Sequence, residues 1–304
     1  MNKYIIYGLM LLSGVFATSC SDDEEILEPS VGVVDNLFAV PDDATGPEAE
    51  LRRNFFKETG TYLMFNDLLS HTVIGQDAYG NDVYKDEYID FTYNLTSSGG
   101  YAPIFEYITD DNAKEAAADL FLKHMYPHVE GSSLLPFSVL LVDNLQTAGY
   151  SGEYKDASTA SCWRCLAVSM GKLLEATDEE AATLAKAVLK DLVSTHVGVY
   201  NDEFEEFLDL SYEYAGEYIT DYIDDWDRSD MTLIYEMGYL SYMESWRGPQ
   251  SDYFPYENVD FNNFFNAVMD RDEADFMAEF GEYPLIVTKY NIIKNVIISL
   301  GYKF

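Results

Sequence analysis

The stretch TDEEAATLAKAVLKDLVSTHVG, residues 177–198, decides the fold of this chain. Thr177 is a helix N-cap residue, and Glu180 stands three residues later, so the two can form a capping box. The residues that follow recur at the three-to-four spacing of a buried helical face: Ala181, Leu184, Ala185, Val188, Leu189, Leu192, Val193, His196 and Val197. Because Gly198 is a suitable C-terminal stop, the pattern predicts a helix over residues 178–197, with a single histidine, His196, on its apolar face.

The segments before this helix predict a small sheet. Residues 162–170, CWRCLAVSM, are β-branched, aromatic and apolar without a helical period, which is typical of a strand. Residues 134–145, LLPFSVLLVDNL, form a continuous apolar run and predict a buried strand. Nearer the N-terminus we expect a helix over 48–58, a strand over 61–65, a turn at 77–82 and a strand or irregular arm over 84–95.

Helices predominate in the rest of the chain. Residues 110–125 predict a second capped helix, which begins at Asp110 or Asp111. Further helices are expected over residues 231–246, 261–269, 272–280 and 284–300. The predicted fold class is therefore α+β and helix-rich, with a small sheet packed on the helix at 178–197.

Composition excludes some partners. The chain has 304 residues, of which 48% are hydrophobic, so it can bury a sizeable core. Its 54 acidic residues against 18 lysines and arginines give a formal net charge of -36. A nucleic acid needs a basic protein surface, so we expect no nucleic-acid partner. The acidity is typical of a secreted protein kept soluble by its charge.

The N-terminus predicts export and lipidation. Lys3 precedes an apolar run over residues 4–16, and three small residues, 17–19, stand directly before Cys20. This pattern resembles a bacterial lipoprotein signal, after whose cleavage Cys20 becomes the lipidated N-terminus; the alternative is an ordinary secretory signal cut near Ala17. The acidic run at 21–25 resembles the export tag of Bacteroidetes lipoproteins displayed on the outer membrane. We therefore expect a signal peptide over 1–19, an acidic tether over 20–48, a single domain over 49–304, and membrane attachment at the cell surface through Cys20.

Two further pairs of residues invite a chemical interpretation. Cys162 and Cys165 have redox spacing but lie in a predicted strand, so structural or free thiols, a disulfide and catalysis all remain open. His124 and His128 are four residues apart, which would let them share a metal on one helix. Pro127 disfavours a continuous helix there, so a helix end running into a loop is the default expectation.

Other catalytic motifs are absent from the sequence. It contains no Gly-x-Ser-x-Gly and no glycine-rich phosphate loop. A zinc peptidase helix carries His-Glu-x-x-His, with the glutamate as general base. None of the four histidines here precedes a glutamate.

The order of segments nevertheless resembles one family. The lipoprotein start, LLPFSVLLVDNL, CWRCLAVSM, the capped helix, YEMGYLSYMESW and the ending EFGEYPLIVTKYNIIKNVIISLGYKF together resemble the zinc-binding metallopeptidase lipoproteins of Bacteroidetes, roughly from Leu51 onward. The resemblance implies a zincin-like fold, a zinc cofactor and peptidase activity. The family's His-Glu-x-x-His would fall on residues 192–196, Leu-Val-Ser-Thr-His, where only the second histidine is present. A later helix start of the family matches residues 259–263, Val-Asp-Phe-Asn-Asn, which lack both of its glutamates.

These departures predict a binding protein rather than a peptidase. Zinc needs at least three protein ligands, and Leu192 and Val193 can supply neither a ligand nor a base. His196 is then a packed, neutral histidine, or a ligand in a rearranged site. We expect a surface lipoprotein without catalysis and without a required cofactor, which binds peptide or glycan in a cleft beside the 178–197 helix.

Two alternatives remain open. The first is an active zinc peptidase whose rearranged site joins His196 to acidic residues of 201–206. The second is a glycan-binding accessory of a polysaccharide-uptake system. It would use the aromatic residues that follow Gly198, which include Tyr200, Phe204, Phe207, Tyr212, Tyr214, Tyr218, Tyr222 and Trp226.

Overall fold

The computed structural model describes residues 36–92, 101–149, 151–197 and 204–304. Every described helix and strand lies in one compact unit, Phe38–Phe304. The predicted signal peptide, Cys20 and the acidic run at 21–25 lie outside the described residues, as do Gly198 and Tyr200.

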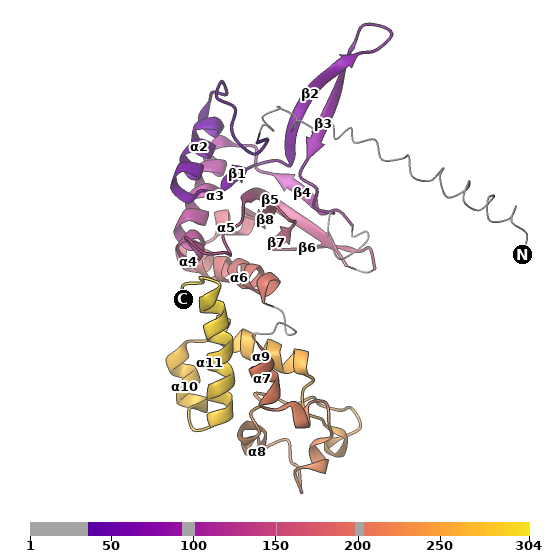
Figure 1. Ribbon diagram of the computed structural model, residues 1–304, viewed down its shortest axis with the longest axis vertical. Helices are drawn as coiled ribbons and strands as arrows, with labels where there is room; N and C mark the ends of the chain where they lie inside the picture. The colour runs from indigo at the N-terminus through magenta and orange to yellow at the C-terminus, as the bar shows by residue number, and fades with distance from the viewer. Residues whose placement is uncertain (1–35, 93–100, 150, 198–203) are drawn as a thin grey trace, which may run out of the picture. The chain divides into compact units, whose positions relative to one another are not determined.

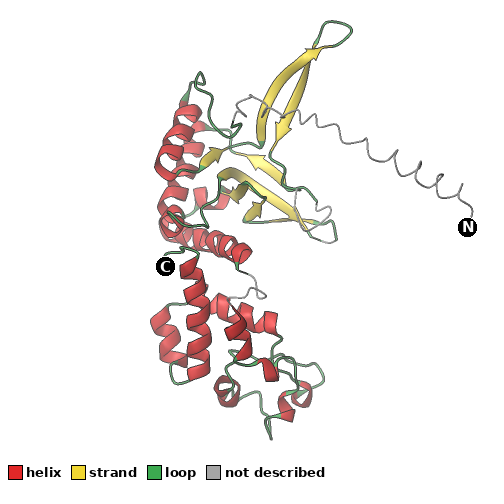
Figure 2. Ribbon diagram, viewed as in Figure 1, coloured by secondary structure: helices red, strands yellow, loops and turns green. Residues whose placement is uncertain are grey.

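A six-stranded mixed sheet is built around one central strand, β5 (Ser138–Ala148). β1 (Tyr62–Met64) pairs parallel to β5 on one side, and β8 (Cys165–Ser169) pairs parallel on the other. The remaining strands are antiparallel to their neighbours: β7 (Thr159–Ser161) beyond β8, and β4 (Ile104–Tyr107) and β6 (Tyr154–Asp156) along the C-terminal half of β5. Among the described residues no strand follows β8, and helices and loops make up the described remainder of the chain (Figure 2).

The two faces of β5 are buried in two different clusters, which explains its unbroken apolar sequence. Successive side chains of a strand point to opposite faces. Val139 and Leu141 join the main core with the helices, whereas Leu140 and Val142 pack with Phe38 on the other face. The predicted buried strand at 134–145 is therefore confirmed, although it begins later, at Ser138.

The strand predicted at 162–170 is shorter than expected. β8 begins at Cys165, and residues 162–164 form the turn that joins it to β7, with the Cys162 N–H donating to the Cys165 carbonyl at 2.9 Å. The aromatic and apolar run is therefore a hairpin turn followed by a strand. The side chain of Trp163 lies in this turn and is exposed.

A second, two-stranded sheet consists of β2 (Leu68–Gln76) and β3 (Asp82–Tyr88), joined by the predicted turn. Asp77 Oδ1 accepts hydrogen bonds from the backbone N–H groups of Tyr79 at 2.8 Å and Asn81 at 2.9 Å, and Gly80 supplies a φ of 81°. Most of the hairpin is exposed on both faces, so it is an arm rather than part of the core.

Five helices accompany the large sheet (Figure 1): α2 (Pro47–Thr59), α3 (Asp111–His124), α4 (Tyr126–Val129), α5 (Gly171–Glu175) and α6 (Asp178–His196). Asp110 caps α3 through a hydrogen bond from the Ala113 N–H. The predicted capping box of α6 is present, with Thr177 and Glu180 bonded to each other's backbone N–H groups at 2.9 and 3.4 Å. The local capping signals therefore predicted both helix starts.

The C-terminal part is helical. Its elements are α7 (Glu205–Asp209), η2 (Tyr212–Tyr214), η3 (Ile219–Asp221), α8 (Thr232–Glu236), η4 (Pro249–Ser251), α9 (Glu257–Asp270), α10 (Glu273–Phe280) and α11 (Pro284–Ser299). The predictions for α10 and α11 are confirmed, and α9 starts four residues earlier than predicted.

The helix predicted over residues 231–246 is wrong beyond its first turn. α8 ends at Glu236, and Gly238 adopts a φ of 85°. A Cβ at this glycine would stand 2.9 Å from Leu285 Cβ, so the chain turns away where it meets α11. Further along, an isolated antiparallel bridge joins Met243 to Tyr253.

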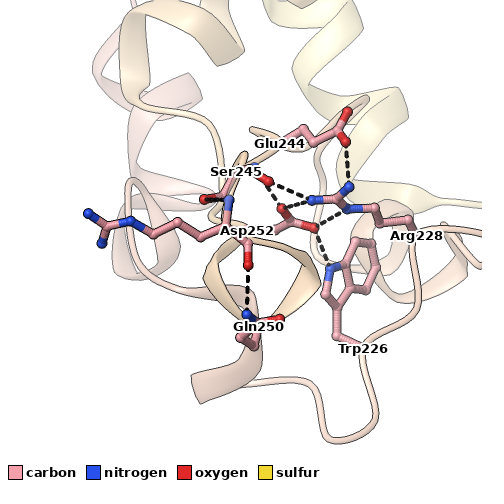
Figure 3. A network of polar contacts seen from close by, with 7 residues as sticks. Trp226, Arg228, Glu244, Ser245, Gln250 and Asp252 are labelled. Carbon is pink, nitrogen blue, oxygen red and sulfur yellow. Dashed lines mark hydrogen bonds and ion pairs between the residues drawn. The ribbon is translucent and has the colours of Figure 1, made fainter.

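One buried carboxylate, Asp252, organises the loops between α8 and α9 (Figure 3). The Arg228 guanidinium donates two hydrogen bonds to the Asp252 carboxylate, at 2.8 and 2.7 Å. Trp226 Nε1 and the Ser245 N–H donate two more, at 3.0 and 2.7 Å. Burial alone would raise the pKa of Asp252, but these hydrogen bonds outweigh it and hold the pKa below the ordinary value. These four hydrogen bonds to one carboxylate hold together loops that have little regular secondary structure.

The architecture confirms the coarse prediction. The described residues form a helix-rich α+β fold in which α6 packs its buried side chains into the same core as β5 and β8.

Candidate functional site

The last turn of α6 is where the resemblance would place a metal-binding motif. Leu192 is 7% exposed and Val193 is fully buried, so both serve the core. His196 is exposed, which contradicts its predicted place on the buried face. Its ring folds back along the helix, with Nδ1 2.9 Å from the Leu192 carbonyl oxygen and 3.0 Å from Thr195 Oγ1. Val197, the residue after the helix, occupies the core instead.

The residues present at this position do not fit zinc. His196 keeps only Nε2 as a ring nitrogen for a metal, because Nδ1 must donate to the Leu192 carbonyl. Among the residues that the structure describes, no group of three His, Cys, Asp or Glu side chains could hold a metal ion. Residues 201–203 of the proposed rearranged site lie outside the described part of the chain.

The second matched segment, residues 259–263, holds an ion pair that the sequence reasoning missed. Asp260 on α9 points into the core, where its Oδ2 lies 2.6 Å from Lys289 Nζ on α11. Lys289 also donates to Ser211 Oγ at 2.5 Å, and its ammonium lies 4.6–5.5 Å from the ring centroids of Phe207, Tyr239 and Phe264. Asp260 Oδ1 has no hydrogen-bond partner.

Burial dominates the ionisation of this pair. It raises the pKa of Asp260 to about 6 against the opposing attraction of Lys289, and it lowers the pKa of Lys289 against the attraction of Asp260. The signal in the sequence was the position of Lys289, which lies on the buried stripe of α11 with Ile286, Tyr290 and Ile293. This segment is therefore part of the core and not a ligand set.

The two histidines at the end of α3 have separate partners. α3 ends at His124, as the proline led us to expect, but a short helix, α4, begins at Tyr126 in place of the expected loop. His124 Nε2 lies 3.0 Å from Asp178, and His128 Nδ1 lies 2.6 Å from the Lys303 carbonyl oxygen. These contacts direct the rings to different groups, so the pair does not converge on one metal.

Both cysteines of the described residues are free thiols. Burial raises the pKa of Cys162 and, more strongly, that of Cys165. A raised pKa disfavours the thiolate, which is the reactive form. The structural or free-thiol interpretation of this pair is therefore the one that the structure favours.

A cavity of about 520 Å³ lies beside α6 and is lined by parts of α3, α4, α6, α9, α10, α11 and the C-terminal residues. Four cationic side chains line it: Lys123, Lys186, Arg271 and Lys294. Its apolar wall includes Leu189, Val268 and Met269. We call this space the basic cavity, and its volume is in the range of small-ligand sites.

Most cations of the basic cavity have an acidic neighbour. Lys123 pairs with Asp178, Arg271 with Glu279 at 2.5 Å, and Lys294 with Glu273 at 2.6 Å. Those three carboxylates are between 51 and 67% exposed, so the pairs are surface pairs. Lys186 is exposed and has no ion pair or hydrogen bond with any described residue.

The aromatic residues after Gly198 divide between core and surface. Phe204 and Phe207 are fully buried and belong to the main core. The exposed rings of the C-terminal part include Tyr212, Tyr218, Tyr222, Trp246 and Tyr256, with Trp246 89% exposed. The predicted aromatic platform therefore has candidates on the surface, but fewer than the sequence suggested.

No protein-family model matches this chain, and neither the curated proteins nor the solved structures contain a significant match to it. Of the helices in the described ranges, none combines the length and apolar character that a bilayer crossing requires.

Proposed function

We propose that the chain is a surface-displayed outer-membrane lipoprotein, anchored through Cys20, whose zincin-like domain binds a peptide without cleaving it. The observation that carries this proposal is that the last turn of α6 contributes to the core, whereas an earlier turn of the same helix lines a cavity. Its last turn has buried apolar residues, Leu192 and Val193, where a peptidase would carry zinc ligand and base, while Lys186 and Leu189 line a cavity.

The topology supports the zincin-like part of the proposal. β8 stands next to the antiparallel edge strand β7, and the chain leads from β8 through α5 directly into α6. Leu166 and Val168 of β8 share the main core with Val188 and Leu189 of α6. This strand-to-helix order beside the sheet edge is the arrangement that the resemblance implies.

Metal content and peptidase activity test the proposal together. The purified full-length lipoprotein, dialysed against zinc and then washed, is expected to retain far less than one zinc ion per chain. It is also expected to leave casein and a quenched-fluorescence peptide library intact. One bound zinc ion per chain with peptide cleavage, both lost in His196→Ala, would overturn the proposal in favour of a rearranged peptidase site.

A glycan-binding accessory is the second candidate, favoured by the exposure of Trp246 and Tyr212. Exposed aromatic rings can stack on sugar rings, and the Arg247 guanidinium lies 5.2 Å from the centroid of the Trp246 ring. Retardation of the protein in polysaccharide-containing native gels, abolished by Trp246→Ala, would select this role. Unchanged migration across a polysaccharide panel would exclude it.

A further inference from the structure

We propose that Cys162 and Cys165 form a redox modification site, at which a small-molecule disulfide oxidises the two thiols to one disulfide across the turn between β7 and β8. The inference goes beyond the proposed function, because it requires neither zinc nor a bound peptide. It is carried by the facing positions of the two cysteines, by the side of the sheet that their side chains share, and by their unequal exposure.

The two cysteines face each other across the turn. β7 and β8 pair Ser161 with Leu166, and the same antiparallel register brings Cys162 opposite Cys165. The Cys162 N–H donates to the Cys165 carbonyl oxygen at 2.9 Å, so the two residues form a hydrogen-bonded pair. The α-carbons of such a pair lie about 5.5 Å apart, which is close to the commonest separation between disulfide-bonded cysteines. The backbone therefore holds the cysteines at the spacing that a disulfide requires.

Both side chains lie on the same side of the sheet. Cys165 belongs to a buried cluster with Phe38, Leu140 and Ala167, and Cys162 packs against that cluster. This agrees with the rule that directly opposite residues of an antiparallel pair share a face. Both cysteines are free thiols in the structure, which therefore describes the reduced state. Closing the disulfide needs rotation of two side chains and no change in strand pairing.

Unequal exposure gives each thiol a different role. Cys162 is half-buried and lines a space of about 470 Å³ together with Tyr88 and Trp163. Cys165 is only 2% exposed. A small-molecule disulfide can therefore reach Cys162 but not Cys165, so Cys162 is the attacking thiol and Cys165 is the resolving thiol.

The reaction is a thiol–disulfide exchange in two steps. The Cys162 thiol loses its proton and attacks one sulfur of the oxidant, RSSR, whose S–S bond breaks. Cys162 is then in a mixed disulfide, and RS⁻ leaves with the electron pair. Cys165 gives up its proton and attacks Cys162 Sγ, which breaks the mixed disulfide and releases the second RS⁻. In total the two cysteines lose two electrons and two protons, and RSSR becomes two RSH.

The surroundings of the thiols agree with these roles. Burial raises the pKa of Cys162, but hydrogen bonds from the backbone of Arg164 and Cys165 oppose the shift. Burial raises the pKa of Cys165 more strongly. Because the thiolate is the attacking form, Cys162 is the better first nucleophile, and the exchange is slow for both thiols.

Tryptic mapping of the full-length lipoprotein detects the bond directly. Trypsin cleaves after Arg164 and so separates the two cysteines into peptides 156–164 and 165–172. The protein is incubated with oxidised glutathione, and the remaining thiols are then blocked with N-ethylmaleimide in urea before digestion. We expect the two peptides to be joined, and to separate when the digest is reduced.

Two matched variants separate the roles of the thiols. Cys165→Ala keeps the attacking thiol and removes the resolving thiol, so we expect glutathione to remain attached to peptide 156–164. Cys162→Ala keeps only the buried thiol and is expected to take up glutathione at least about tenfold more slowly. Circular dichroism checks that both variants are folded as the wild type is.

The same incubation in urea separates the effect of the fold from the closeness of the cysteines in sequence. At one fixed ratio of reduced to oxidised glutathione, we expect the ratio of joined to unjoined peptides to be about tenfold higher for the folded protein. The reason is that the hairpin holds the two thiols opposite each other, whereas the unfolded chain does not.

Three outcomes would overturn the inference: no joined peptides from the folded wild type, a lasting glutathione adduct on its Cys162, or as much joining in urea as in the folded protein. The result is separable from the proposed function. Each of these outcomes leaves the expected zinc content and the expected lack of peptide cleavage unchanged, whereas stoichiometric zinc with cleavage would leave the disulfide chemistry unchanged.

Discussion

Asp260 and Lys289 form an ion pair inside the C-terminal helices, with Oδ2 and Nζ 2.6 Å apart and neither side chain more than 4% exposed. The pair joins α9 to α11, and Ser211 completes it from the segment after α7. Burying two charges costs several kcal/mol for each ion, and only their mutual attraction and hydrogen bonds offset that cost. The pair therefore makes the packing of these helices depend on both partners.

Replacing one partner should be far worse than replacing both. Lys289→Met leaves the Asp260 carboxylate buried without a counter-charge, and we expect it to lower the free energy of unfolding by about 3–5 kcal/mol. The double variant Lys289→Met/Asp260→Leu should recover most of that loss. Urea unfolding followed by circular dichroism measures both.

Lys294→Met is the matched control for this prediction, because Lys294 lies on the same helix but pairs with the exposed Glu273. We expect it to change the free energy of unfolding by less than about 1 kcal/mol. If Lys289→Met/Asp260→Leu were as unstable as Lys289→Met alone, the loss would not come from leaving the Asp260 carboxylate without its counter-charge.

The raised pKa of Asp260 predicts a pH dependence with a definite sign. Its pKa is about 6 in the folded chain and ordinarily 3.8, so between these values the folded state binds more protons than the unfolded state. The contribution of Asp260 to the free energy of unfolding therefore has its full value below about pH 4, and it is lost as the pH rises through 6.

Comparison with Asp260→Asn isolates this contribution from that of the many other acids. The free energy of unfolding of the wild type, minus that of the variant, should fall between pH 4 and pH 7. Urea titrations at half-unit intervals measure the difference. A difference that rises over this range would mean that Lys289 lowers the pKa of Asp260 more than burial raises it.

Asp252 should be indispensable to the loops between α8 and α9 (Figure 3). Asp252→Ala leaves the Trp226 indole N–H and the Ser245 N–H without their acceptor, and we expect a loss of about 2–4 kcal/mol. Tryptophan fluorescence should shift to the red as Trp226 gains access to water. Glu244→Gln removes only the exposed partner of Arg228 and should cost less than about 1 kcal/mol; an equal cost would contradict the central role of Asp252.

Local signals predicted the helices well because their causes are close in sequence. Thr177 and Glu180 cap each other, and Asp110 bonds to a backbone N–H three residues away, so a short window contains the whole interaction. The end of α8 depends instead on Leu285, which meets Gly238 only after the chain has folded. The sequence of residues 231–246 alone therefore could not predict where α8 ends.

The candidate site was harder to predict for the same reason. Lys123, Lys186, Arg271 and Lys294 come from four distant segments, and only packing brings them around one cavity. His196 was placed on the buried face by its spacing from Leu192, but an imidazole at the end of a helix can bond to the Leu192 carbonyl and remain in solvent. Hydrophobic spacing does not distinguish these two positions for a polar ring.

Anchoring through Cys20 predicts a clear change in partitioning. Cys20→Ala removes the thiol that would be acylated, and we expect the protein to move from the detergent phase to the aqueous phase on Triton X-114 separation. Mass spectrometry of the wild-type N-terminal peptide should show the acyl chains, and two or more are needed for a stable anchor. Cys162→Ala keeps Cys20 and should partition as the wild type does. An unmodified N-terminal peptide that begins near Thr18 would instead identify an ordinary secretory signal.

The acidic run after Cys20 predicts which side of the outer membrane the domain faces. Replacing Asp22, Asp23, Glu24 and Glu25 with alanine removes the tag-like charge but leaves the lipidated cysteine. We expect the wild type to be degraded by proteinase K added to intact cells and the variant to be protected, with equal amounts of both in the membrane fraction. The acylated N-terminal peptide should be unaltered apart from the four substitutions, because the change acts after lipidation. Equal degradation of the two proteins would mean that the run serves only as a solvated tether, and surface display would then need another signal.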